Sequence, residues 1–226
     1  MSPLAIKNSH NLDIDQFDMK SIFFTDSIMF NSLTMRDSLS SFLDKIFASL
    51  LIVVFSPIIL MTSILIRMNM GKGILYKQER VGRNGFHFTI YKFRTMVNDA
   101  ESLTGAVLSS KNDPRVTSLG KFLRLSHVDE LPQLINVLKS EMSFVGPRPE
   151  RPEFVNQFQK EIEGYKNRHS VKPGITGLAQ ICLPYDATAK EKLQYDQFYI
   201  NNRHSVFFNL IISFYTAFKM ITFFRS

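Results

Sequence analysis

Two adjacent carboxylates, Asp129 and Glu130, stand where the sequence predicts the start of a helix. Apolar side chains follow at i, i+3, i+4 and i+7, namely Leu131, Leu134, Ile135 and Leu138. Pro132 fits only the first turn of such a helix, where its missing N–H is harmless, so the helix begins near Asp129. Carboxylates at this positive helix end, which also attracts phosphate, suit phosphate chemistry. A structural alternative stays open, with Asp129 as an N-cap and Glu130 as a favourable first-turn charge.

Cations flank these carboxylates on both sides in the sequence. Arg124 lies just before them, and Pro147-Arg148-Pro149 follows the predicted helix. A proline on each side fixes the backbone around one guanidinium, which suits rigid presentation of Arg148 to a planar anion or base. A plain turn is the alternative. Arg124 and the Pro147, Arg148 and Pro149 run are therefore candidate substrate-binding residues.

A β-hairpin is predicted upstream of the carboxylates. Residues 74–78 form a short strand, Asn84-Gly85 is a strong tight-turn signal, and residues 86–91 alternate apolar and polar side chains. The hairpin displays five cations: Lys77, Arg80, Arg83, Lys92 and Arg94. Lys92 and Arg94, at the end of the second strand, are further candidate substrate-binding residues. A solvated hairpin face is the alternative.

Two segments predict contact with a membrane. Residues 46–66 carry no Asp, Glu, Lys or Arg, and a straight helix over them would be about 31 Å long, enough to cross a bilayer core. Ser56-Pro57 lies at the middle, where the proline kinks the helix and frees backbone groups for which the Ser56 hydroxyl is a candidate partner. A kinked spanning helix and a re-entrant helix that returns to the same face both stay open. The aromatic stretch 206–224 predicts a helix lying in the interface, with a core helix as the alternative.

The charge of the chain is uneven. The net charge is +7, yet residues 1–45 are acidic on balance, so the positive charge lies after residue 66. A basic body next to an apolar segment suits an anionic membrane surface, phosphorylated substrates or nucleic acid. Cys182 is the single cysteine, which excludes an intramolecular disulfide and a cysteine-based metal site. The sequence has no G-x-x-x-x-G-K-[ST] phosphate loop, so ATP hydrolysis of that type is not expected.

Several stretches together match one family. They are Phe55-Ser56-Pro57, residues 76–82 (YKQERVG), 91–96 (YKFRTM), 128–133 (VDELPQ), 146–149 (GPRP) and 171–177 (VKPGITG). From about Leu43 to about Phe218 the chain resembles the bacterial sugar transferases called monotopic polyprenyl-phosphate glycosyl-1-phosphate transferases. Residues 149–154 and 193–196 are most similar to members from exopolysaccharide or capsule pathways. The chain resembles a minimal short form, without the extra N-terminal membrane helices of many members.

The resemblance implies a mainly helical α+β fold with a re-entrant membrane helix, a small β-hairpin and interfacial amphipathic helices. It divides the chain into an N-terminal segment of unknown role (1–42), the re-entrant helix (43–70), bent at Ser56-Pro57, and a cytoplasmic catalytic domain (71–226) that ends in an interfacial helix. The expected location is the cytoplasmic face of the bacterial inner membrane. The expected partners include the membrane lipids and exclude nucleic acid.

The implied activity is transfer of a sugar-1-phosphate from a uridine-diphosphate (UDP) sugar to polyprenyl (undecaprenyl) phosphate, with release of UMP. This would be the first membrane step of exopolysaccharide, capsule, O-antigen or glycoconjugate synthesis. The family's Asp-Glu dyad falls on Asp129 and Glu130, and Mg²⁺ is the implied cofactor. We expect Asp129 to form a covalent aspartyl-phosphosugar intermediate and Glu130 to bind Mg²⁺. The residues expected to hold phosphate or uridine are Arg124 and Arg148, with Lys92 and Arg94 as additional candidates.

Three departures from the family pattern are present. Leu178 replaces a usual tryptophan and is expected to alter the substrate pocket, Asn209 stands where an aspartate is expected, and Arg203-His204 adds one residue before Ser205. Two other classes of function stay open. One is a membrane-bound protein whose basic face binds anionic lipid or nucleic acid. The other is a metal-dependent phosphodiesterase that hydrolyses nucleotide sugars.

Overall fold

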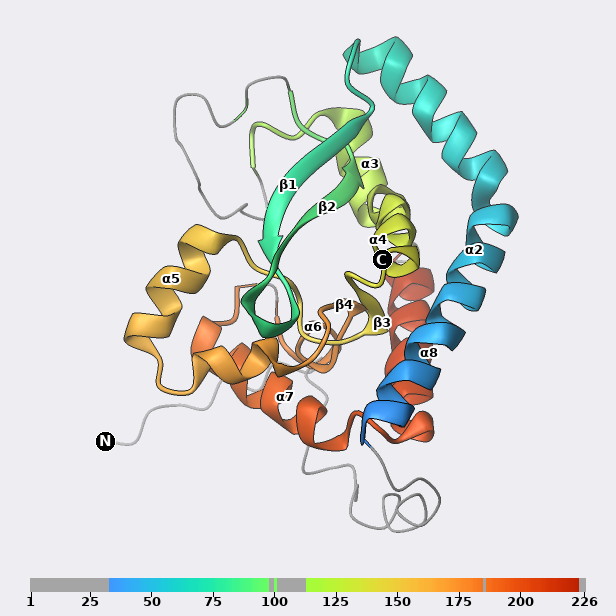
Figure 1. Cartoon of the computed structure of the whole chain (residues 1–226). Helices are drawn as coiled ribbons and strands as arrows, with labels where there is room; N and C mark the ends of the chain where they lie inside the picture. The colour runs from blue at the N-terminus through green and yellow to red at the C-terminus, as the bar shows by residue number, and fades with distance from the viewer. Residues whose placement is uncertain (1–32, 98–99, 101–112, 185, 224–226) are drawn as a thin grey trace.

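The computed structural model describes residues 33–97, 100, 113–184 and 186–223. These residues form a mainly helical α+β structure. One long helix, α2 (Leu33–Met70), runs along a body of shorter helices and two small sheets (Figure 1). The predicted mainly helical α+β class is therefore confirmed, whereas the re-entrant course of the membrane helix and the interfacial helices stay predictions. Most of the predicted N-terminal segment 1–42 lies outside the described residues, and residues 33–42 belong to α2.

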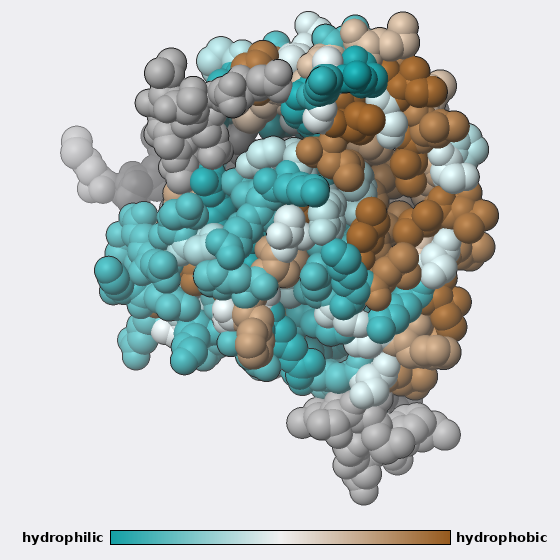
Figure 2. All heavy atoms as spheres, turned by 45° about the horizontal axis from the view of Figure 1, so that its top comes forward, coloured by the Kyte–Doolittle hydropathy of each residue, from teal (hydrophilic) through white to brown (hydrophobic). Residues whose placement is uncertain are grey.

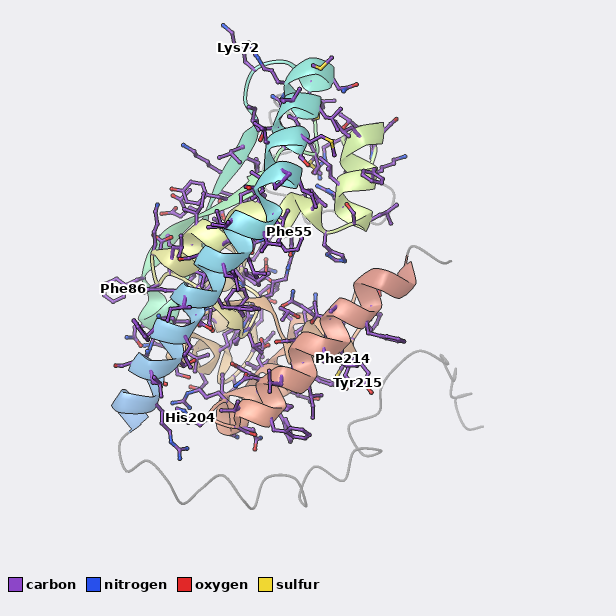
Figure 3. The ribbon with its side chains drawn as sticks, turned by 90° about the vertical axis from the view of Figure 1, so that its right-hand side faces the viewer. Phe55, Lys72, Phe86, His204, Phe214 and Tyr215 are labelled. Atoms are coloured by element: carbon purple, nitrogen blue, oxygen red, sulfur yellow. The ribbon has the colours of Figure 1, made fainter. Side chains whose placement is uncertain are left out.

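The apolar segment forms one continuous helix that contains its proline. Because Pro57 has no N–H, the carbonyl of Val53 loses its helical partner. The Ser56 hydroxyl donates to this oxygen instead, at 2.8 Å, as the sequence predicts. Figure 1 shows α2 curved, with its convex side turned away from the rest of the chain, and Figure 3 places Phe55 midway along it.

The outer side of α2 is strongly apolar. By length and composition, α2 is the one helix among the described residues that could cross a membrane, and only 11% of its most apolar window is buried. Figure 2 shows hydrophobic atoms gathered along one side of the molecule, over α2, and mostly hydrophilic atoms over the rest of the face in view. The large apolar side chains that α2 exposes are Leu39, Phe42, Leu43, Ile46, Phe47, Leu50, Val53, Val54, Ile58, Leu60, Met61, Ile64, Leu65 and Met68. An apolar surface of this size marks a contact with lipid or with another protein.

Both ends of α2 are fastened to the same body. Near the N-terminal end, three polar side chains on one helix face bond to residues far along the chain: Asp37 to Arg83 at 2.9 Å, Ser41 to Lys172 at 2.7 Å, and Asp44 to Ser143 at 2.7 Å. Near the C-terminal end, Ile66 is fully buried in a cluster with Phe93 and Leu123. The Arg94 guanidinium also donates to the carbonyl of Met70, the last residue of α2.

The predicted β-hairpin is present. Strands β1 (Leu75–Val81) and β2 (His87–Phe93) pair antiparallel, with Lys77 opposite Tyr91. The short 3₁₀ helix η2 (Arg83–Gly85) joins them, and Asn84 adopts φ 57°, the left-handed conformation that asparagine tolerates well. Ile90 and Phe93 of β2 are buried, so one face of the hairpin belongs to the core.

The rest of the body consists of short elements. They are α3 (Ser118–Leu125), η3 (Val128–Gln133), α4 (Leu134–Leu138), β3 (Ser143–Val145), α5 (Pro152–Glu161), η4 (Tyr165–Ser170), β4 (Gly174–Thr176), α6 (Leu178–Cys182), α7 (Ala189–Asn202) and α8 (Val206–Phe223). Strands β3 and β4 pair in parallel. Beyond this pair, the Gly146 amide donates to the carbonyl of Thr176 at 2.9 Å, and the Gly174 amide donates to that of Pro147 at 3.0 Å. A Cβ atom on Gly174 would lie 2.1 Å from the Gly146 nitrogen, so this crossing requires glycine.

The C-terminal helix α8 has two different faces. Phe208 and Ile212 are buried in a core cluster with Val145 and Leu178, whereas Phe214 is 70% exposed. Figure 3 shows the Phe214 and Tyr215 side chains extending from α8 on the side away from α2. The helix therefore contributes to the core with one face and exposes an apolar second face. Its place in a membrane interface stays a prediction.

The departures at positions 178 and 209 have local structural roles. Leu178 is 6% exposed in the core, so it can influence the site only through neighbours such as Val145. The Asn209 amide donates to the carbonyls of Arg203 at 2.8 Å and Ser205 at 3.0 Å. An ionised aspartate has no donor for these carbonyls. Asn209 thus stabilises the turn at Arg203-His204.

Candidate active site

The backbone that carries the two carboxylates is a 3₁₀ turn that continues into a short α-helix. η3 begins at Val128, and its N-cap is His127, in the left-handed conformation at φ 55° and without a side-chain capping bond. Asp129 lies inside the first turn. The interpretation of Asp129 as the N-cap is therefore wrong, because the chain turns two residues earlier than the Pro132 position suggests. The Asp129 carboxylate therefore does not cap this helix.

Glu130 is held by two cations from distant parts of the chain. Its Oε1 atom accepts from Lys92 Nζ at 2.7 Å and from Arg148 Nη2 at 2.9 Å. Burial raises the pKa of Glu130, but Lys92 and Arg148 together hold it well below its usual range. Burial lowers the pKa of Lys92, and Glu130 opposes that shift. The structure thus brings three of the predicted site residues into direct contact, with Glu130 ionised.

Asp129 differs sharply from its neighbour. Its exposed fraction is 8%, and no hydrogen bond to its carboxylate occurs within the described part of the chain. Burial, followed by the charge of Glu130, raises the pKa of Asp129 to about 6. Two adjacent carboxylates with pKa values pushed apart are typical of functional sites. Asp129 is therefore a poorly solvated carboxylate, ionised at neutral pH and without a neutralising partner of its own.

The other predicted cations occupy two different places. The Arg124 Nε atom donates to Thr95 Oγ1 at 2.9 Å, and its charge lowers the pKa of Asp129, so Arg124 acts on this carboxylate electrostatically. Arg94 donates to the carbonyl of Lys72 at 2.6 Å as well as to Met70. Arg94 therefore fastens the end of α2 to the hairpin, and its contact with substrate stays a prediction.

The Pro147–Pro149 segment is held through its backbone. Each of its three carbonyls accepts a hydrogen bond from a different element: Pro147 O from Gly174 N at 3.0 Å, Arg148 O from Arg168 Nη2 at 2.8 Å, and Pro149 O from Arg80 Nη1 at 3.1 Å. From this held segment the Arg148 guanidinium reaches Glu130. The predicted rigid presentation of Arg148 thus has a structural basis.

Sequence reasoning missed the supports of this segment. Arg168 and Asp196 form a buried ion pair with an Nη2–Oδ2 distance of 2.9 Å. Arg168 lies in η4 and Asp196 in α7, so no local spacing connects them. The available signal was the basic run just before the Val171–Gly177 motif, which does not reveal which cation points inward.

The match to a known family covers most of the chain. The model of the family "Bacterial sugar transferase" matches residues 35–223. The chain is 42% identical over 183 residues to "UDP-N-acetylgalactosamine-undecaprenyl-phosphate N-acetylgalactosaminephosphotransferase" of Aeromonas hydrophila, which covers 80% of this chain and 43% of that protein. It is 40% identical over 181 residues to "UDP-glucose:undecaprenyl-phosphate glucose-1-phosphate transferase" of Klebsiella pneumoniae, which covers 78% of this chain and 38% of that protein.

A third relative has a similar length. The chain is 37% identical over 186 residues to "Exopolysaccharide production protein PSS" of Rhizobium leguminosarum bv. phaseoli, which covers 78% of this chain and 92% of that protein. By contrast, the chain spans less than half of the Aeromonas and Klebsiella relatives. The matched region contains α2, the hairpin, the carboxylate pair and Pro147–Pro149. The chain belongs to the bacterial sugar transferase family.

Proposed function

We propose that this protein transfers a sugar-1-phosphate from a UDP-sugar to polyprenyl (undecaprenyl) phosphate and releases UMP. The reaction would be the first membrane step of exopolysaccharide, capsule, O-antigen or glycoconjugate synthesis. The printed names of the relatives support the reaction class. The observation that carries the proposal is the pairing of an unengaged, buried Asp129 with a Glu130 clamped by Lys92 and Arg148.

The proposed chemistry has two displacements at one phosphorus atom. An Asp129 oxygen attacks the sugar-linked phosphorus, the bond to the bridging oxygen breaks, and its electron pair leaves with UMP. An oxygen of the lipid phosphate then attacks the same phosphorus, and the bond to Asp129 breaks, which restores the carboxylate. A pKa of about 6 leaves Asp129 mostly ionised at neutral pH, and the missing hydrogen bonds leave its lone pairs available. Covalent catalysis divides a difficult transfer into two easier ones.

The cations of the site supply electrostatic stabilisation. Transfer of a phosphoryl group depends mainly on positioning and on neutralising the charge of the phosphate oxygens. Arg124 beside Asp129 and Arg148 on Glu130 are the guanidinium groups in reach of such a phosphate. Lys92, on strand β2 of the hairpin, also contacts Glu130.

The carboxylates also suit a magnesium ion. Lys92 and Arg148 both donate to Oε1 of Glu130. The Oε2 atom of Glu130 and the Asp129 carboxylate therefore remain as oxygen ligands for a metal ion. The described residues contain no group of three His, Cys, Asp or Glu side chains suited to a metal. Mg²⁺ commonly uses one or two carboxylates together with substrate phosphates and water. Bound there by Glu130, it would neutralise charge on the diphosphate of the donor.

The membrane geometry of the proposal is a re-entrant α2 on the cytoplasmic face of the inner membrane. A spanning α2 would separate its two ends by a bilayer, yet both ends bond to the same body. Single thiols at the exposed positions Ser40 and Asn69, in a Cys182→Ser background, test this topology. A membrane-impermeant maleimide should label both only in inverted vesicles. Labelling of either thiol from outside intact cells would contradict the re-entrant topology.

The reaction is tested by a UMP-release assay over a panel of UDP-sugars with Mg²⁺. We expect multiple turnovers only when polyprenyl phosphate is present, and none from Asp129→Asn. Without the lipid, the peptide that contains Asp129 should gain the mass of one sugar phosphate, and the lipid should remove it. Sustained UMP release without lipid would indicate a hydrolase instead. Absence of UMP release with every donor would indicate a binding protein, and a ternary rate pattern without an adduct would replace the covalent scheme.

A further inference from the structure

The position of Arg148 depends on hydrogen bonds that its own segment accepts. Pro147 and Pro149 have no N–H groups, so the segment is held mainly as an acceptor. Arg168 donates to the central carbonyl, that of Arg148 itself, at 2.8 Å. The Arg148 side chain leaves the same residue to reach Glu130 at 2.9 Å. Arg168 therefore contacts the residue that in turn contacts Glu130 of the proposed catalytic pair.

Arg168 is unusually well fixed for a residue that holds a single carbonyl. Its exposed fraction is 5%, and that of Asp196 is 2%. Its Nε and Nη2 atoms lie 3.1 and 2.9 Å from Asp196 Oδ2, and Nη1 donates to the Tyr165 hydroxyl at 2.8 Å. Burying two charges is costly, and replacement of a buried ion pair by apolar residues of similar volume is often neutral or stabilising. An apolar pair would lack two hydrogen bonds of Arg168, the one to the Tyr165 hydroxyl and the one to the Arg148 carbonyl, and only the second bears on the site.

Packing alone does not fix this segment. A small, partly open hollow with room for about one water molecule lies against it, lined also by His169 and Val171. His169 is 7% exposed, and within the described structure neither ring nitrogen has a hydrogen-bond partner. Side-chain packing on this side of the segment is therefore incomplete, and the hydrogen bonds to its carbonyls contribute to holding it in place.

We propose that Arg168, with Asp196 as its counter-ion, is a positioning residue for the sugar-phosphate transfer. It fixes the Arg148 carbonyl and thereby the guanidinium on Glu130, without touching a substrate. This inference rests on the proposed function. Without Arg168, Arg148 moves off Glu130, and Lys92 alone holds that carboxylate. A misplacement of about 1 Å in such a site can reduce the rate about 100-fold.

A double-mutant cycle tests the inference. Arg168→Met with Asp196→Leu removes both charges together, which avoids an unpaired buried charge. We expect this pair to lower kcat for UMP release about 10–100-fold, with little change in KM for the UDP-sugar and a melting temperature close to wild type. In an Arg148→Met background, the same pair should lower kcat less than about threefold, because its effect passes through Arg148.

Other results would overturn the inference. An undiminished kcat in the paired variant, or equal losses with and without Arg148, would show that the ion pair supports only the fold. Arg168→Lys, which keeps the charge but not the planar fork, provides a second cycle if the paired variant does not fold. A crystal structure of the variant gives a readout independent of activity, since Arg148 should leave Glu130. A wild type that releases no UMP would contradict the proposed function, whereas an unmoved Arg148 would contradict this inference.

Discussion

The Asp129→Asn variant should be more stable than the wild-type protein. Burial and the charge of Glu130 raise the pKa of Asp129 from 3.8 to about 6, so the folded state disfavours the ionised carboxylate. A shift of about 2 pK units corresponds to about 3 kcal/mol of destabilisation above pH 6. An amide has no charge to bury, although it does not reproduce a protonated carboxyl. We therefore expect a gain of about 1–3 kcal/mol at pH 7.5, or roughly 3–10 °C in melting temperature for a chain of this size.

The pH dependence gives the sharper test. Because the pKa is raised in the folded state, the penalty is fully present above pH 6 and disappears as the pH falls towards 3.8. The stability difference between variant and wild type should therefore shrink over this range. The chain has no tryptophan, so circular dichroism of the protein in detergent is the suitable measurement.

An exposed aspartate provides the matched control. Asp186→Asn removes the same charge at an exposed position and should change the melting temperature little at any pH. An Asp129→Asn variant that is equally stable or less stable than wild type between pH 6 and 8 would refute the burial argument. It would mean that the cations of the site stabilise the ionised Asp129 carboxylate by more than burial and the charge of Glu130 destabilise it.

Three further predictions follow from the geometry. The transfer rate should fall about tenfold per pH unit below about pH 6 as Asp129 takes up its proton, and a flat pH–rate profile down to pH 5 would contradict this. Gly174→Ala should destabilise the fold by about 3 kcal/mol or more, because its Cβ would lie 2.1 Å from the Gly146 nitrogen. Gly71→Ala, where nothing lies within 4 Å and φ is +77°, should cost only about 1 kcal/mol in thermal unfolding. Ser56→Ala should destabilise α2 by about 1 kcal/mol, because a carbonyl in an apolar environment loses its donor; an unchanged melting temperature would show that this carbonyl finds another partner.

Local signals in the sequence predicted the elements well. Asn84-Gly85 correctly predicts the hairpin, because few residue pairs tolerate that turn. The uncharged run after Lys45 correctly predicts a long helix, but not that it begins at Leu33. Residues 33–44 escape a hydropathy criterion because Asp37 and Asp44 are charged. Asp37 pairs with the Arg83 guanidinium and Asp44 accepts a hydrogen bond from the Ser143 hydroxyl, and both partners lie too far along the chain for any window to include.

The sequence selected residues that the structure brings together, but it did not predict the contacts that connect them. Residue types and spacing selected Asp129, Glu130 and Arg148, and the structure brings Glu130 and Arg148 together. The N-cap interpretation failed because the turn at His127 depends on a left-handed backbone, which is uncommon outside glycine and which the residue pattern does not reveal. The Arg168 support was missed because a buried cation has no local sequence signature that separates it from a solvated one.

The attachment of α2 at both ends fixes the distance between the active site and the membrane surface. A helix that spans a bilayer can tilt to match the thickness of the surrounding lipid. In the re-entrant topology proposed here, α2 cannot tilt independently of the body. Near one end it is hydrogen-bonded to the body through Asp37, Ser41 and Asp44, and near the other end it packs against the same body through Ile66. The height of Asp129 above the bilayer is then set by the protein and not by the lipid. Transfer in synthetic bilayers should accordingly vary little with acyl-chain length, provided that the lipid phosphate stays at the surface.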